Sequence, residues 1–153
     1  MIVDDLVRRA FRDLSTARLA TIDPRGAPYV ATLWFVWHED GLYLSTRLGS
    51  PTWQHAESDP RVSLVIDRGR EWAELAGVGI EGLAELLPAE HPDMRTPMSA
   101  WHEKYRSMLA GDGFERFTQA VPHLGFLRVE PVGLRTWDHA WHEGGIAGPE
   151  GRS

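Results

Sequence analysis

Apolar and polar residues alternate along much of the chain, the period-two pattern that is typical of half-buried β-strands. Turn residues separate the first three segments of this kind, at Asp23-Pro24-Arg25-Gly26 and at His38-Glu39-Asp40-Gly41. The pattern therefore predicts strands that follow one another through hairpins. We expect six or seven strands, at residues 17–22, 28–37, 42–46, 61–67, 78–87, 124–129 and 132–137.

Two of these strands depart from simple alternation. The segment 28–37 is apolar on both faces, so we expect both of its faces to be covered. Glycines interrupt the segment 78–87, which predicts a bulge or a bend. Residues 68–76 read as a loop.

Helical periodicity is confined to shorter stretches, and we expect two or three helices. Asp4 or Asp5 can cap a first helix, and Ser50 followed by Pro51 is a typical start of a second one, which ends near residues 58–60. Thr96-Pro97 begins a third, and residues 114–120 can form a shorter one. Their predicted apolar faces are Leu6, Val7, Ala10, Phe11 and Leu14 in the first helix, and Met98, Trp101, Tyr105, Met108 and Leu109 in the third.

Strands linked by hairpins, rather than strands alternating with helices, favour an antiparallel barrel over a doubly wound parallel sheet. The fold class we predict is mainly β with helical insertions. We expect one domain over residues 1–143 and a flexible, glycine-rich tail over residues 144–153.

The composition of the chain limits the kinds of molecule that we expect it to bind. The net charge of −6 argues against nucleic-acid binding, and no apolar run approaches the ~20 residues of a membrane span. The N-terminus alternates charged and apolar residues, unlike a signal peptide, and the chain has no cysteine, so we expect a cytoplasmic protein. Seven tryptophans are many for 153 residues, and some can line a pocket for a flat ring.

The segment from Thr46 to Thr52 carries the most informative chemistry. A strand ends in hydroxyls and Arg47, a glycine gives the turn, and a helix begins at Ser50. A helix N-terminus offers free N–H groups, and an arginine adds a two-pronged cation, so the segment suits a phosphate. The alternative is an ordinary strand-to-helix turn with a serine cap and a surface arginine.

The order and spacing of several blocks together resemble the flavin- and deazaflavin-binding split β-barrels related to pyridoxamine 5′-phosphate oxidase. The resemblance covers residues 17–87, is weaker over residues 88–125, and resumes near residues 125–137. The blocks that carry it are Ala17-Arg18-Leu19-Ala20-Thr21-Ile22-Asp23, Leu33-Trp34-Phe35-Val36-Trp37, Gly41-Leu42-Tyr43-Leu44-Ser45-Thr46-Arg47, Asp59-Pro60-Arg61-Val62-Ser63-Leu64 and Glu81-Gly82-Leu83-Ala84-Glu85.

The resemblance implies an antiparallel split β-barrel of the FMN-binding type, which forms a homodimer with cofactor sites at the subunit interface. The flat ring would lie along the long strand at Thr32, Leu33 and Trp34. The phosphate would be bound by Thr46, Arg47, Ser50 and Thr52. Trp53, next to them in the sequence, can pack on the cofactor.

One position departs from the family. Many members carry a lysine where this chain has Thr52, so one cation is missing from the phosphate site. The choice between FMN and the deazaflavin coenzyme F-420 stays open. Among the basic residues only Lys104 is a lysine, a bias that hints at an actinobacterial source, where the deazaflavin is available.

Histidines and tryptophans also gather near the C-terminus, at Trp137, His139, Trp141 and His142. They can close over a ring in the neighbouring subunit, or they can belong to a partly ordered terminus with nothing to bind. The histidine pair lacks an evident third ligand, so we predict no metal site.

The function we predict is a flavin- or deazaflavin-dependent oxidoreductase that transfers a hydride to or from a small organic substrate. The cofactor would carry the chemistry, and the sequence identifies no catalytic residue. The alternative is a non-catalytic binding protein for flavin, haem or another planar ligand. A third possibility is a dimeric interaction protein whose cofactor site has decayed.

Overall fold

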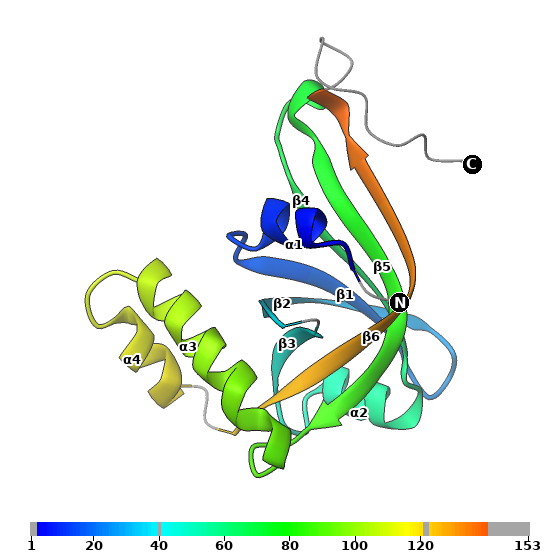
Figure 1. The fold of residues 1–153 in the computed structure, drawn as a ribbon. Coiled ribbons are helices and arrows are strands. Elements are labelled where there is room, and N and C mark those ends of the chain that lie inside the picture. Colours follow the sequence, from blue (N-terminus) through cyan, green and yellow to red (C-terminus); the bar gives the residue numbers. More distant parts are fainter. Residues whose placement is uncertain (1–2, 40, 121–122, 141–153) are drawn as a thin grey trace.

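The computed structural model describes residues 3–39, 41–120 and 123–140. Its centre is a closed antiparallel barrel whose strands neighbour one another in the order β1-β2-β3-β6-β5-β4 (Figure 1). The predicted fold class is confirmed. The strands are β1 (Thr16–Ile22), β2 (Pro28–His38), β3 (Gly41–Arg47), β4 (Arg61–Arg68), β5 (Ala76–Leu87) and β6 (Leu124–Asp138).

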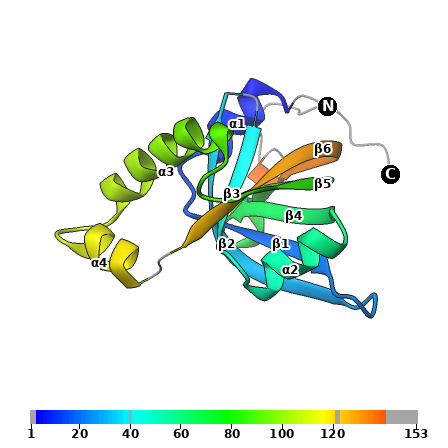
Figure 2. The ribbon, with the colours of Figure 1, turned by 90° about the horizontal axis from the view of Figure 1, so that it is seen from below.

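Helices cover parts of the barrel rather than alternating with its strands. The α3–α4 pair lies along one side of the barrel, and α2 lies at another (Figure 2). No helix in the part of the chain that the structure describes is long and apolar enough to cross a membrane. The helices are α1 (Asp5–Phe11), α2 (Pro51–Ser58), α3 (Arg95–Met108) and α4 (Gly113–Ala120), with 3-10 turns at Trp72–Glu74 and Pro92–Met94.

Alternation along the strands fills the barrel. Leu19 of β1 is the register partner of Leu64 of β4, which is in turn the partner of Ile80 of β5. All three side chains are buried. Because successive residues of a strand point to opposite faces, their neighbours Ala20, Ser63 and Glu81 point outward.

The two predicted final strands are one. Residues 124–129 and 132–137 belong to the continuous β6, which pairs with β5 from Phe126 to Asp138. A shift in register opposite Glu81 and Gly82 accommodates the extra residue Val132, so the strand bends without ending. The glycines of residues 78–87 predicted a bulge or a bend there, and the register shift does fall beside Gly82, although the extra residue belongs to β6. The predicted loop 68–76 contains one turn of 3-10 helix, Trp72–Glu74.

Two predicted apolar faces are wider than the real ones. In α1, capped by Asp4, Phe11 is buried but Leu6 is exposed, and Val3 ahead of the helix is buried in the core. In α3, Trp101 and Tyr105 are buried, whereas Met108 at the end of the helix is exposed.

The hydroxyl of Tyr105 joins α3 to the β1–β2 ladder at the point where the ladder ends. The Phe35 N–H donates to this hydroxyl at 2.7 Å. The hydroxyl lies 2.8 Å from the Ser15 carbonyl oxygen and 2.7 Å from the Phe35 carbonyl oxygen, and these two oxygens share its one proton as acceptors. The hydroxyl thus stands where the next direct strand-to-strand bond would form. Burial raises the pKa of Tyr105, so the group remains a protonated donor.

Lys104 binds the main-chain carbonyl of Phe35, the residue whose N–H binds Tyr105. Its Nζ donates to the Phe35 carbonyl oxygen at 2.8 Å and lies 3.7 Å from the centroid of the Phe35 ring. Burial lowers the pKa of Lys104 to about 8, partly offset by the charge of Asp13. Adjacent residues of α3 therefore hold both polar groups of one buried strand residue.

Replacing Tyr105 with phenylalanine should leave the Phe35 N–H and the Ser15 carbonyl without their bridge. We expect the free energy of unfolding in urea to fall by about 1–3 kcal/mol, the typical cost of an unsatisfied buried polar group. Tyr29→Phe is the matched control, since Tyr29 is exposed and its loss of a hydroxyl should change stability by less than about 0.5 kcal/mol. Equal effects of the two variants would contradict this role for Tyr105.

Candidate functional site

Strands β2 and β3 pair over only part of their length, and the site lies where they separate. Their pairing runs from Phe35 opposite Leu44 to His38 opposite Gly41. The part of β2 that precedes Phe35 in the sequence is paired with β1 but not with β3. The Ser45 hydroxyl bridges the start of the gap by donating to the Trp34 carbonyl at 3.3 Å.

Main-chain groups of alternate strand residues point to opposite neighbours. Phe35 directs its N–H and C=O toward the β1 side, where Tyr105 meets them, and Trp34 directs its carbonyl toward Ser45 of β3. Thr32, two residues before Trp34, therefore also faces the gap, whereas the main chain of Leu33 faces β1. The main-chain groups of Thr32 therefore face the gap, where a ligand can reach them, and the Trp34 carbonyl lies at the start of the gap, bonded to Ser45.

A pocket of about 390 Å³ occupies this gap. The structure brings seven of the eight predicted site residues to its lining: Thr32, Leu33, Trp34, Thr46, Arg47, Ser50 and Thr52. Trp53 is not part of the lining. It is half-buried and packs against the barrel core, close to Gly125 of β6, where a Cβ would lie 2.7 Å from the Trp53 ring. That these residues bind a cofactor stays a prediction.

Hydroxyl groups line the end of the pocket at the start of α2. The Thr46 and Ser50 hydroxyls lie 2.9 Å apart, and the Trp53 N–H donates to Ser50 Oγ at 3.2 Å, so Ser50 is the predicted N-cap. Pro51 has no N–H, and the N–H of Thr52 has no acceptor within the helix by α-helical geometry. Arg47, at the end of β3, is exposed to solvent at the same place.

The other residues of the lining were not predicted from the sequence. They are Tyr29, Ser45, Pro51, Phe117 and Leu124. Phe117 lies on α4 and Leu124 begins β6, both within the part of the sequence where no chemical motif stands out. The packing of α4 beside Trp34 brings Phe117 to the pocket, and the pairing of β6 with β3 places Leu124 opposite Arg47.

His55 of α2 lies behind the lining rather than in it. Its Nδ1 lies 3.2 Å from the Thr21 hydroxyl, and its ring meets the Tyr29 ring edge-on with centroids 5.1 Å apart. Since Tyr29 lines the pocket, His55 supports a pocket residue and does not itself reach the pocket.

Two residues of the C-terminal aromatic cluster, Trp137 and His139, belong to the described part of the chain. Trp137 lies across Gly77 of β5, where an added Cβ would come within 2.3 Å of its ring. The His139 Nδ1 lies 2.9 Å from the Trp72 carbonyl oxygen, and neither residue lines the pocket. Trp141 and His142 lie outside the described residues.

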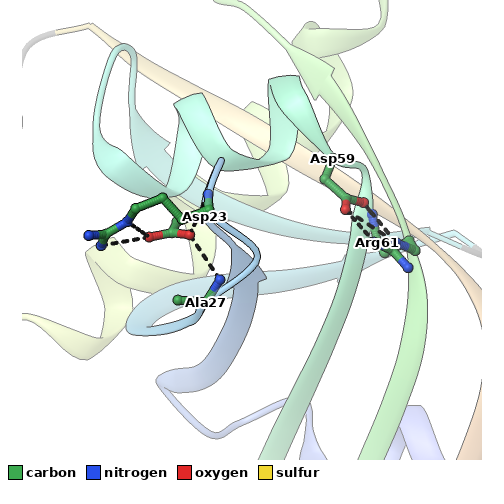
Figure 3. Close-up of polar contacts among 5 residues, drawn as sticks. Asp23, Ala27, Asp59 and Arg61 are labelled. Atoms are coloured by element: carbon green, nitrogen blue, oxygen red, sulfur yellow. Dashed lines mark hydrogen bonds and ion pairs between the residues drawn. The ribbon is translucent and has the colours of Figure 1, made fainter.

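Two aspartates fix the turns beside α2 (Figure 3). Asp23 accepts from the Ala27 N–H at 2.9 Å within the β1–β2 turn, and Asp59 pairs with Arg61 at 2.6 Å just after α2. The hydrogen bond from Ala27, aided by Arg25, lowers the pKa of Asp23. The hydrogen bond from the Arg61 side chain lowers the pKa of Asp59 to about 2.

An antiparallel barrel that opens between two neighbouring strands, with a hydroxyl-lined pocket in the opening, is a split β-barrel. The profile of one such family, described as pyridoxamine 5'-phosphate oxidase, matches residues 3–138. The chain belongs to this family, as the resemblance implied.

Solved structures share the fold. A conserved hypothetical protein of Mycobacterium tuberculosis, Rv2991, is 26% identical with a TM-score of 0.75, and the match covers 98% of this chain and 94% of that one. An F420 reductase is 16% identical with a TM-score of 0.62, over 87% and 98% of the two chains. A FAD-binding protein of Mesorhizobium loti is 20% identical with a TM-score of 0.63, over 89% and 95%. No curated protein matches the sequence.

Asp59→Asn should lower stability in a pH-dependent manner. The folded pKa of about 2 lies below the ordinary value of 3.8, so the contribution of Asp59 is fully present above pH ~4 and is lost as the pH falls toward 2. We expect the thermal midpoints of the wild type and the variant to differ at neutral pH and to converge between pH ~4 and ~2. The thermal midpoint of Arg61→Gln should also lie below that of the wild type at neutral pH and converge with it over the same pH range. A difference that persists at pH ~2 would contradict the stabilising role of the Asp59–Arg61 pair.

Proposed function

We propose that the chain binds FMN or the deazaflavin coenzyme F-420 in the pocket between β2 and β3, and that it acts as an oxidoreductase on a small organic substrate. One observation carries the proposal. Strand β2 turns the main-chain groups of Thr32 toward the gap, outside its pairing with β3, and the hydroxyls and Arg47 at the start of α2 line the same pocket.

These residues fit such a cofactor. Main-chain donors and acceptors suit the polar edge of a flavin-type ring, whereas hydroxyls, a guanidinium and a helix N-terminus suit a phosphate. The bound cofactor would supply the ring that accepts or gives up a hydride. The role of the protein residues is to orient the ring, hold the phosphate and limit the access of water.

The choice between the two cofactors rests on the phosphate end. Thr52 is almost fully buried and carries no charge where many family members have a lysine, so Arg47 provides the cation of this lining. The F420 reductase and the FAD-binding protein share the fold, which supports a flavin-type cofactor without choosing between FMN and F-420. Haem stays the alternative ligand, and no histidine is among the described residues that line the pocket.

We further propose that the protein is a homodimer and works in the cytoplasm. The outward face of β1, β4 and β5 carries small residues such as Ala20 and Ser63, together with the exposed apolar side chains of Val30 from β2 and Leu83. Thr32, on the same face, belongs to the pocket lining, so the face continues into the site. A second copy of the chain would cover these side chains and complete the coverage expected for the two-sided apolar strand.

The dimer is tested by sedimentation at micromolar concentration. The expected mass is twice the 17.2 kDa of one chain. Leu83→Arg should shift the population to monomer, because it replaces an exposed apolar side chain of this face with a long charged one. Glu57→Arg, an exposed charge reversal on α2, is the control. A monomer mass for the wild type would overturn the dimer.

The cofactor is tested by titrating the purified protein with FMN and with F-420, following ring absorbance and fluorescence. Tight binding of one of them identifies the cofactor. Binding of neither would contradict the proposal, and haem added to the same protein would then test the non-catalytic alternative through its absorption band.

Arg47→Met distinguishes phosphate binding from ring binding. We expect the affinity for FMN to fall about 5- to 30-fold, which corresponds to about 1–2 kcal/mol for a charge-assisted contact at a partly exposed site. Riboflavin, which has the same ring and no phosphate, should bind both proteins equally. The corresponding pair for the deazaflavin is F-420 and its phosphate-free chromophore. An equal loss for both members of a pair would remove Arg47 from the phosphate site.

A further inference from the structure

Of the 16 lysine and arginine residues of the chain, Lys104 is the one lysine. An arginine keeps its charge at every physiological pH, whereas the amine of a partly buried lysine can lose its proton and act as a nucleophile. Lys104 lies on α3 and does not line the pocket between β2 and β3, so the proposed function makes no use of its amine.

One side of this amine rests against a single residue of β2. The Nζ of Lys104 donates to the Phe35 carbonyl oxygen at 2.8 Å and lies 3.7 Å from the centroid of the Phe35 ring. The centroid of the Tyr105 ring, on the same helix, is 5.3 Å from Nζ. Lys104 is half-buried rather than enclosed, so small solutes can reach its amine from the solvent side.

The surroundings of the amine favour its uncharged form. Asp13, an exposed residue between α1 and β1, supplies an attractive charge, but the desolvation caused by burial outweighs it and lowers the pKa of Lys104 to about 8. Among the described residues, β2 presents the carbonyl and the ring of Phe35 to the amine. The Tyr105 hydroxyl of the same helix stays protonated, because burial raises its pKa. A sizeable fraction of the Lys104 amine is therefore neutral near physiological pH.

We propose that Lys104 is an acylation site, that it accepts a small acyl group from an acyl phosphate or an acyl thioester, and that its acylation loosens α3 from β2. A lysine amine becomes an effective nucleophile when its surroundings disfavour the charged form. The acyl group must be small, because Nζ lies in contact with the ring and the carbonyl of Phe35. The inference concerns α3 and holds whether or not the pocket binds a flavin-type cofactor.

The reaction is an acyl transfer without a change of oxidation state. A bond forms between Nζ and the carbonyl carbon of the donor, and the bond from that carbon to the phosphate oxygen or to the thioester sulfur breaks. The leaving group takes the electron pair of the broken bond, and a proton from Nζ reaches it through water. The products are an amide at Lys104 and free phosphate or free thiol.

Acylation removes the interactions that hold Lys104 in place. The amide nitrogen carries no charge and one N–H, so the attraction between a cation and the Phe35 ring is lost, and the acyl group needs space beside the Phe35 carbonyl. Lys104 and Tyr105 bond α3 to the main chain of Phe35. Since α4 follows α3 and places the Phe117 ring 4.5 Å from the Trp34 ring, centroid to centroid, a looser α3 would also disturb one side of the pocket.

The test is acetylation of the purified protein with acetyl phosphate in one arm and acetyl coenzyme A in another, followed by peptide mass spectrometry. We expect an adduct at Lys104 in at least one arm, and the faster arm identifies the class of donor. Peptide masses separate this adduct from one on the α-amino group of the chain. The rate at Lys104 should rise with pH and level off above pH ~8, following the neutral fraction of the amine.

The matched control moves the lysine to an exposed position. The double variant Lys104→Arg with Arg116→Lys carries its one lysine on the exposed surface of α4. At pH ~7.5 we expect this amine to react at least about tenfold more slowly than Lys104, because an exposed lysine amine with a pKa of about 10.4 is almost entirely protonated. Its rate should keep rising beyond pH ~9.

Hydrogen exchange tests the effect on α3. In protein acetylated at Lys104, the main-chain amides of α3 and α4 should exchange at least about threefold faster, whereas those of β4 and β5 should be unchanged. Lys104→Arg, treated with the same reagent, keeps its charge and should exchange as the untreated variant does.

The two readouts test the two parts of the proposal. No adduct at Lys104 in either arm, or a rate no higher than that of the exposed lysine in the double variant, overturns the acylation site. Acetylation at Lys104 that leaves exchange in α3 unchanged overturns the loosening of the helix. Neither result bears on the proposed function, because both readouts are made without a cofactor.

Discussion

The buried peptide groups of Phe35 are the point on which the arrangement of the pocket depends. Strand β2 leaves β1 and joins β3 at this residue, and its N–H and carbonyl are satisfied by Tyr105 and Lys104 of α3 instead of by a strand. An unsatisfied pair of this kind would be costly inside the barrel, so the barrel requires α3 to be docked. The docked helix in turn positions α4, and with it one side of the pocket. The opening between β2 and β3 and the helical cover beside it are thus two consequences of one strand leaving its neighbour.

Much of the fold could be predicted because its signals are local. Turn residues such as Asp23 and Gly26 mark the hairpins, Ser50 and Pro51 mark the start of α2, and all of these act within a few residues of chain. The errors arose where a distant partner decides. Two final strands were expected around Pro131, but pairing with β5 continues across the bulge and makes them one. The faces of α1 and α3 were overestimated because the periodicity of a helix does not reveal how far its neighbour extends.

The residues of the pocket likewise fall into those that local sequence predicts and those that only a distant contact places there. Its polar residues were predicted because Thr46 to Thr52 form one short segment, whose spacing and family resemblance pointed to the same place. Trp53 was assigned to the pocket because it adjoins this segment, yet the turn of the helix directs it into the core beside Gly125. Phe117 could not have been predicted, because a phenylalanine on an amphipathic helix is ordinarily core. Only the docking of α4 next to Trp34 makes it part of the lining.

The closure of the barrel also has a consequence for the order of folding. The hairpin of β1 and β2 and the turn into α2 need only local contacts, but β3 meets β6 by joining Thr46 to Gly125 across more than half the chain. Loop closure over such a span is slow, so the local hairpins can form well before β6 arrives. Until then the polar residues of the pocket exist without the opposite side. We therefore expect the pocket to be among the last parts of the molecule to assemble, and local opening of the β3–β6 edge to dismantle it while most of the sheet persists.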